Sequence, residues 1–281
     1  MARTRSGGLL LLLLGCLHSY REAFLSTTKP LSNERHRSGC LVPYRTMKAR
    51  SGAAVRRALS PEQSVRQLIE EWPDNPDQED TMELNQALRK LPKVSSADAF
   101  AQLPGNWKVE WGSRSGSASK KSGPVNLKFL SFGTLPETKV SIVGGYNRIL
   151  KDAGGGGNTY ELLQVFTLPD SADGAEAAMV LSGPWTSGSS EGEWGKGAER
   201  NRCGVQFKTV RLALSASNPE TSKAMLSEAG LLNYMEPNDV KAQATYVDVN
   251  FINQEWRWHK GESGDDYVLK RMESDVPFAL D

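Results

Sequence analysis

The sequence predicts a mainly β fold: an antiparallel β-barrel with a short helical lead before it and one late helix. Three observations lead to this prediction. After Pro104 the apolar residues change from helical spacing to alternation, which is typical of half-buried strands. About eight or nine alternating segments follow, each bounded by Gly, Ser, Pro, Asn or Asp. Few helices interrupt them, which favours an antiparallel barrel over a parallel sheet.

Residues 1–23 have the composition of a signal peptide. Arg3 and Arg5 precede an apolar run that includes six consecutive leucines, Leu9 to Leu14. A membrane-spanning helix needs about 20 apolar residues, so this run is too short to cross a bilayer and fits the h-region of a signal peptide. The alternatives are an uncleaved short anchor or an artefact of the chosen gene start.

Residues 24–58 have the composition of a plastid transit peptide. They contain eight Lys or Arg and a single acidic residue, Glu34, with several Ser and Thr and no sustained periodicity. A signal peptide followed by such a segment resembles the two-part leaders of nucleus-encoded plastid proteins in algae with complex plastids, where a residue such as Phe24 opens the transit segment. The alternative is a disordered basic arm that binds acidic surfaces.

The charge of the remaining chain argues against nucleic-acid binding. Of the 34 basic and 33 acidic residues, residues 1–58 hold 11 and 2, so the rest carries 23 and 31, a formal charge of −8. General nucleic-acid binding requires clustered positive charge. Only Cys203 of the three cysteines lies beyond residue 58, so no internal disulfide is expected there, and no Asn-x-Ser/Thr acceptor occurs. Both absences fit a reducing compartment such as the plastid stroma.

Residues 59–103 predict a helical lead. Ser60 is a candidate N-cap and Pro61 suits the first helical position, and apolar residues recur at helical spacing as far as Trp72. A second helix is expected over 81–91 and a third over 95–103, the latter capped by Ser95 or Ser96.

The sequence predicts that residues 104–273 form the barrel and that residues 274–281 form a tail. Trp107, Val109 and Trp111 share one face of the first expected strand, as do Val125, Leu127 and Phe129 in the second. The Gly-rich segments 151–158 and 182–201 are expected to be loops, the first a hairpin loop because strands flank it on both sides. A helix is expected between Asn218 and Gly230. The expected strands cover 105–112, 124–132, 139–150, 159–168, 177–183, 203–215, 244–252, 254–260 and 266–272.

The barrel region lacks the residue sets of ordinary enzymes. His259 and Cys203 are its only histidine and cysteine, which excludes a His-rich or Cys-rich metal site within one chain. A Cys–His nucleophile pair is conceivable, but a lone Cys on a strand is more typically a small core residue. The segment 261–265 lies between strands and lacks the GxSxG pattern. No catalytic residue, metal site or cofactor is therefore predicted.

The aromatic residues of the strands allow two interpretations. A barrel of about eight strands can hold one hydrophobic ligand, or the aromatic side chains fill the interior. Arg257 adds a second open question. If Trp256 and Trp258 face inward, Arg257 lies on the outer surface; if the faces are reversed, it is an interior cation that requires a partner, for which Asp248 is the natural candidate.

Segments at both ends of the barrel resemble the plastid lipid-associated protein family, the fibrillins or plastoglobulins. The likeness covers residues 60–272 loosely, including the helical lead. That family's domain opens with a Leu-x-Gly-x-Trp-x-Leu-x-Tyr strand and closes with Tyr-Leu-Asp, Leu-Arg-Ile-x-Arg-Gly and Phe-Val-Leu-x-Arg. The corresponding residues here are Leu103, Gly105, Trp107, Val109 and Trp111, then Tyr246-Val247-Asp248, Trp256-Arg257-Trp258-His259-Lys260-Gly261 and Tyr267-Val268-Leu269-Lys270-Arg271.

The resemblance implies a lipocalin-like barrel in a plastid, on the stromal side of thylakoids or at plastoglobules. It implies a non-enzymatic protein that binds or organises lipids, carotenoids or prenylquinones and associates with a peripheral membrane or lipid-droplet surface. We also consider a protein-interaction scaffold or assembly factor with a side-chain-filled barrel, and an enzyme that uses Asp248, Arg257 or His259 on a hydrophobic substrate. The sequence predicts no oligomeric state. The ligand-binding candidates are Trp107, Trp111, Tyr246, Asp248 and Arg257.

Overall fold

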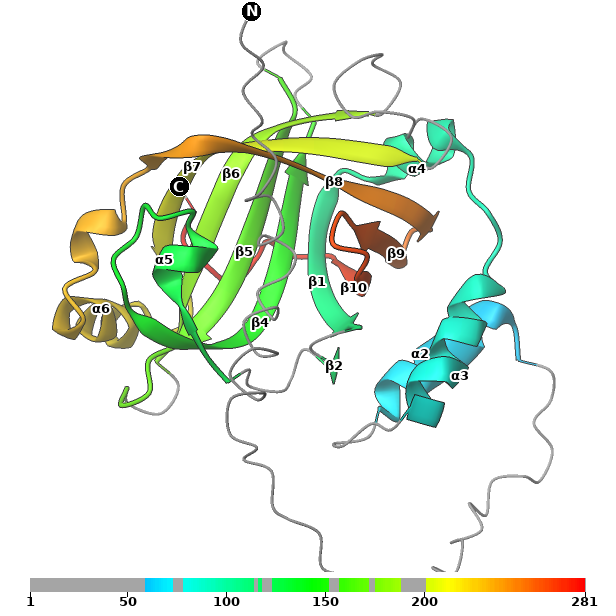
Figure 1. Ribbon diagram of the computed structural model, residues 1–281, viewed down its shortest axis with the longest axis horizontal. Helices are drawn as coiled ribbons and strands as arrows, with labels where there is room; N and C mark the ends of the chain where they lie inside the picture. Colours follow the sequence, from blue (N-terminus) through cyan, green and yellow to red (C-terminus); the bar gives the residue numbers. More distant parts are fainter. Residues whose placement is uncertain are drawn as a thin grey trace, which may run out of the picture.

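The computed structural model (Figure 1) describes residues 59–72, 78–113, 116–117, 123–151, 157–171, 175–187 and 201–280. The expectations for the leader, residues 1–58, lie outside the described residues. So do most of the expected 151–158 loop and residues 188–200 of the second Gly-rich segment.

The helices agree well with the sequence prediction. Ser60 forms a capping box at the start of the first one, since its hydroxyl accepts from the backbone N–H of Gln63 while the Gln63 side chain accepts from the backbone N–H of Ser60. Ser95 caps the third. Asn218 and Pro219 begin the late helix, and Gly230 follows its end at a φ of +69°. The helices are α2 (Pro61–Glu70), α3 (Gln78–Arg89), α4 (Ser96–Gln102), α5 (Leu127–Leu130) and α6 (Pro219–Glu228), with a 3₁₀ turn η2 (Leu232–Tyr234).

The strands form an antiparallel barrel, which confirms the predicted fold class. The pairing of β1 with both β10 and β4 closes eight strands, β1 and β4 to β10, into a ring, and β2 and β3 extend the sheet at its ends. The strands are β1 (Gly105–Gly112), β2 (Gly116–Ser117), β3 (Pro124–Asn126), β4 (Lys139–Leu150), β5 (Thr159–Thr167), β6 (Ala177–Ser187), β7 (Arg202–Leu214), β8 (Asn238–Ile252), β9 (Trp256–Gly261) and β10 (Asp266–Met272).

A bulge in β1 corrects the expectation that Trp107, Val109 and Trp111 share a face. The register with β10 shifts between Val109 and Trp111. A bulge inserts an extra residue and so reverses the side-chain alternation that follows it. Trp107 therefore belongs to the main core, whereas Trp111 packs outside the barrel wall with Phe251 and other residues of a second cluster.

Three other strand boundaries differ from the prediction by four residues or more, and one of them is the start of β8, at Asn238 rather than at 244. The expected strand 124–132 ends at Asn126, whose side chain accepts a hydrogen bond from the Lys128 backbone N–H at 2.9 Å and caps the short helix α5. Phe129 is consequently exposed, at 61%. The expected loop 182–201 begins later, because β6 continues to Ser187 and buries Trp185.

Apolar side chains pack in three clusters. The largest contains the inward-facing residues of the strands together with apolar residues of α4, α5 and α6. The second lies where α2 and α3 cover the outer face of β9 and β10 (Figure 1), and includes Trp111, Trp256 and Val268. In the third, Val276 and Phe278 of the C-terminal segment cover the outer face of β5 and β6.

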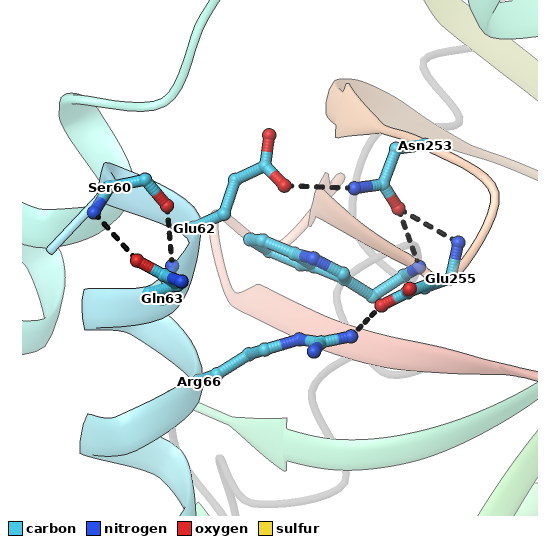
Figure 2. Close-up of polar contacts among 7 residues, drawn as sticks. Ser60, Glu62, Gln63, Arg66, Asn253 and Glu255 are labelled. Atoms are coloured by element: carbon cyan, nitrogen blue, oxygen red, sulfur yellow. Dashed lines mark hydrogen bonds and ion pairs between the residues drawn. The ribbon is translucent and has the colours of Figure 1, made fainter.

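Polar contacts also tie α2 to the turn between β8 and β9 (Figure 2). The Asn253 amide donates to the Glu62 carboxylate at 3.2 Å, and its carbonyl oxygen accepts from the backbone N–H groups of Glu255 and Trp256 at 2.9 Å. Arg66 pairs with Glu255. The helical lead is therefore an outer layer of the barrel rather than a separate unit.

Gly105 allows Arg271 to close over Trp107. The Arg271 guanidinium carbon lies 4.1 Å from the centroid of the Trp107 ring, and Nη1 donates to the Pro104 carbonyl at 2.8 Å. Gly105 has a φ of +134°, and a Cβ there would collide with Arg271 Nη1. Glycine is required both for the backbone conformation and for this approach.

Replacing Gly105 by Ala should lower the free energy of unfolding by about 3 kcal/mol, because it combines backbone strain with displacement of Arg271. Urea denaturation measures this change. Gly133 is the matched control, since its φ of +88° is also left-handed but nothing lies within 4 Å of a Cβ there. Gly133→Ala should cost only about 1 kcal/mol, and equal losses at both positions would show that the contact with Arg271 contributes nothing.

Candidate functional site

The candidate site is centred on Arg257, whose side chain points into the barrel. Along β9, Trp256 and Trp258 belong to the outer cluster beneath α2 and α3, so Arg257 and His259 face the interior. Arg257 is 0% exposed, and His259 is 3% exposed. The structure thus answers the open question about this strand: the tryptophans face outward and the arginine faces inward.

Arg257 reaches across the interior to the far side of the ring. Its Nη2 donates to Oδ1 of Asn147 on β4, although β10 and β1 separate β9 from β4 in the barrel. The Tyr160 hydroxyl on β5 donates to the same Asn147 oxygen at 2.8 Å. Asn147 holds its orientation by donating Nδ2 to the Tyr146 carbonyl at 2.9 Å. These contacts form a buried polar cluster of Arg257, Asn147 and Tyr160.

The cluster leaves the cation incompletely satisfied. Within the described residues Arg257 pairs with no carboxylate, and its Nε and Nη1 have no hydrogen-bond partner. Burial lowers the pKa of Arg257, while the adjacent Tyr160 opposes that change. The Trp107 ring, 4.9 Å from the guanidinium carbon, supplies a cation–π contact. A buried charge without a counter-charge is costly, so this arrangement is unusual for a purely structural residue.

Arg271 is the second cation on Trp107, and its role differs. Its Nη1 and Nη2 donate to the carbonyls of Pro104 and Gln102 in the segment that joins α4 to β1. Burial and the charge of Arg257 both lower the pKa of Arg271. Arg271 therefore holds the start of the barrel through two of its three nitrogens, whereas in the described part of the chain Arg257 bonds through Nη2 alone.

Asp248 does not pair with Arg257, which corrects the expected partnership. It accepts two hydrogen bonds from Arg202, Nε to Oδ1 at 2.8 Å and Nη2 to Oδ2 at 3.0 Å. The Arg202 guanidinium carbon also lies 3.5 Å from the centroid of the Tyr246 ring. Asp248 lies opposite Lys260 in the β8–β9 register, on the other side of the wall from Arg257.

The structure therefore brings together two of the five predicted ligand-binding residues, Trp107 and Arg257. Trp111 lies in the outer cluster, and Tyr246 and Asp248 belong to the ion-pair site of Arg202. The sequence prediction did not include Asn147 or Tyr160. A signal existed for Asn147, since it alternates with Ile149 on an otherwise apolar face of β4. No sequence pattern indicates that β4 and β9 face each other across the barrel.

Cys203 and His259 are not poised for nucleophilic catalysis. Desolvation raises the pKa of the Cys203 thiol to about 12, although nearby Arg257 opposes the shift. Burial, and then the charge of Arg257, lower the pKa of His259 well below its ordinary value. At neutral pH these residues are a protonated thiol and a neutral imidazole, and His259 Nδ1 has no hydrogen-bond partner among the described residues. A thiolate nucleophile requires the opposite shift.

The described residues contain no group of three or more His, Cys, Asp or Glu side chains placed to hold a metal ion. None of the helices in these segments is both long and apolar enough to cross a bilayer.

The fold and the site define an antiparallel β-barrel whose aromatic interior holds a desolvated, incompletely paired arginine. Comparisons with protein-family models, curated protein sequences and solved structures gave no match.

The buried ion pair of Arg202 and Asp248 should contribute more to the free energy of unfolding than the exposed pair of Arg66 and Glu255, which Figure 2 shows. The Arg202 and Asp248 side chains are only 8% and 10% exposed, whereas Arg66 and Glu255 are 47% and 63% exposed. Asp248→Ala should reduce the free energy of unfolding by about 3 kcal/mol, because it removes the bidentate acceptor of a buried guanidinium. Glu255→Ala should cost less than about 1 kcal/mol. Urea denaturation of both variants tests the ranking, which a larger loss for Glu255→Ala would contradict.

His259 should make the fold sensitive to acid. Because folding lowers its pKa, the unfolded state binds a proton that the folded state does not. The contribution of the neutral His259 to the free energy of unfolding is present above the unfolded pKa of about 6.5 and is lost as the pH falls below that value. Between about pH 7.5 and about pH 5.5, wild type should lose about 1 kcal/mol more stability than His259→Gln. Urea denaturation at the two pH values measures the difference, and parallel losses would refute a neutral buried imidazole.

Proposed function

We propose that this chain is a non-enzymatic binding protein that holds a hydrophobic small molecule inside its barrel. We further propose that it binds or organises lipids, carotenoids or prenylquinones in a plastid, on the stromal side of thylakoids or at plastoglobules.

 The single observation that carries the proposal is Arg257, a fully buried guanidinium whose Nε and Nη1 have no hydrogen-bond partner among the described residues of a largely apolar interior.

The interior has the chemistry of a site for an apolar molecule with one polar end. Binding sites of this kind are lined by hydrophobic and aromatic side chains, with a few polar groups that fix orientation. Trp107, Tyr160 and Phe207 supply aromatic surface in the main core, and Tyr160 and Phe207 pack edge-on at 6.3 Å. Arg257 and Asn147 supply the polar end. A barrel of about eight strands is wide enough to hold one small ligand.

The plastid and lipid-surface parts of the proposal are supported by the sequence. The resemblance of both ends of the barrel to the plastid lipid-associated proteins favours a lipid ligand. The composition of residues 1–58 independently favours the same compartment.

A second candidate is a protein-interaction scaffold whose barrel is filled by its own side chains. The observation that favours it is the near-complete burial of large interior residues, since Trp107 and Phe166 are 0% exposed and Leu181 is 1% exposed. This function predicts no ligand in the barrel and co-migration with a protein complex after detergent has removed the lipid.

Ligand titration separates the two functions. The delipidated chain is titrated with a carotenoid, a prenylquinone and a galactolipid while tryptophan fluorescence is followed, and lipids that co-purify with the native protein are identified by mass spectrometry. The binding function predicts saturable quenching by at least one probe and a matching co-purified lipid. No quenching by any probe, with no lipid bound to the native protein, would refute it.

A pair of neighbouring substitutions locates the ligand. Leu181 faces the interior: it is paired with Leu162 on β5, which is itself paired with Asn147 on β4. Val180 instead lies in the third cluster, beneath the C-terminal segment. Leu181→Phe should weaken binding at least about tenfold by occupying interior space, while Val180→Phe should leave it unchanged. Equal effects of the two substitutions would place the ligand outside the barrel.

A further inference from the structure

We propose that Arg257 binds the carboxylate of an amphiphilic monocarboxylate, such as a fatty acid, whose apolar chain lies among the interior side chains. This inference rests on the proposed function and specifies the chemical class of the ligand. The observations that carry it are that, in the part of the chain that the structure describes, Arg257 is fully buried, pairs with no carboxylate and has no hydrogen-bond partner for Nε or Nη1.

The charge of Arg257 favours an anion over a neutral acceptor. Its polar neighbours are the amide oxygen of Asn147, which accepts from Nη2 and from Tyr160, and the Tyr160 phenol, and neither group carries a net charge. A ketone or alcohol oxygen would satisfy one donor but would leave the buried charge uncompensated. A carboxylate satisfies the donors and supplies the counter-charge, and arginine–carboxylate hydrogen bonds are among the strongest in proteins.

The guanidinium is also held in place before any ligand arrives. Asn147 fixes Nη2, and the ring of Trp107 lies 4.9 Å from the guanidinium carbon. Trp107 and Asn147 are paired neighbours on β1 and β4, so together they hold the guanidinium, and the side chain needs little further ordering on binding. Such preorganisation lowers the entropic cost of association.

The surroundings match one negative charge better than two. Arg271, the neighbouring cation, has already committed Nη1 and Nη2 to backbone carbonyls. Burial and Arg257 keep the pKa of His259 low, so its imidazole adds no positive charge at neutral pH. Among the described residues, Arg257 is the interior cation with two nitrogens still without a partner, which suits a monocarboxylate rather than a dianionic phosphate. The aromatic and aliphatic residues of the main core favour an apolar chain on that carboxylate.

Matched ligands test the inference directly. Dodecanoate and dodecanol share a chain length and differ in the head group, and acetate supplies the carboxylate without the chain. Affinities for the delipidated full chain are measured by titration calorimetry at about pH 8, where the acid is ionised. Wild type should bind dodecanoate roughly 10- to 100-fold more tightly than dodecanol. Acetate at the same concentration should not displace dodecanoate.

Variants identify the residue responsible. Arg257→Met should bind dodecanoate and dodecanol equally, because it removes the cation but keeps an apolar side chain of similar length. Replacing a buried charged group by an apolar one is often neutral or stabilising, so this variant should fold. Arg66→Met is the control, because this exposed arginine lies on α2 outside the barrel. It should keep the wild-type preference for the acid.

The outcomes distinguish this inference from the proposed function. Equal wild-type affinities for acid and alcohol, or an acid preference that survives in Arg257→Met, would overturn the carboxylate site while leaving a hydrophobic-ligand barrel intact. Displacement of dodecanoate by acetate would overturn the requirement for an apolar chain. If the chain binds neither dodecanoate nor dodecanol and also fails with the carotenoid, quinone and galactolipid, both proposals fail. The two wild-type affinities decide the question even if a variant does not fold.

Discussion

The rest of the structure depends on closure of the sheet between β1 and β4. Trp107 is opposite Arg271 on one neighbouring strand and opposite Asn147 on the other, so one residue joins the last strand of the barrel to an early one. Only in the closed ring can Arg257 of β9 reach Asn147. An open sheet with the same strand order would leave these residues far apart. The buried polar cluster is therefore a consequence of topology as well as of sequence.

Closure of the barrel places the guanidinium groups of Arg257 and Arg271 over one indole, that of Trp107. The two groups differ in their hydrogen bonds. Arg271 donates to two backbone carbonyls and so holds the segment before β1 against the barrel. Arg257 is completely buried, and its Nε and Nη1 have no partner within the segments that the structure describes. An arginine needed only for packing could be replaced by an apolar side chain without the cost of desolvating a charge. This difference between the two arginines is the physical basis of the proposed anion site at Arg257.

Much of the fold could be predicted from the sequence because its signals are local. The capping box at Ser60, the Asn218-Pro219 helix start and the alternation of the strands all depend on neighbouring residues. The errors arose where local patterns are ambiguous or interrupted: the bulge that turns Trp111 outward, and the Asn126 cap that ends β3 early. The site was only partly predictable. Trp107 and Arg257, both named from the sequence, do lie together, but Asp248, the candidate partner of Arg257, pairs with Arg202 instead, and choosing between the two arginines requires the β7–β8 register.

The inward orientation of Arg257 is coupled to the helical lead on the outside of the barrel. Side chains alternate along β9, so a shift of one residue would place Trp256 inside and Arg257 outside. The observed register instead buries Trp256 to 4% exposure beneath α2 and α3, where its ring lies 4.6 Å from that of Phe251. Burial of one large aromatic side chain contributes about 2–3 kcal/mol, which offsets part of the cost of desolvating the arginine. The helices α2 and α3 thus help to keep Arg257 inside the barrel. The stability of the outer layer and the orientation of the interior arginine depend on the same register of β9.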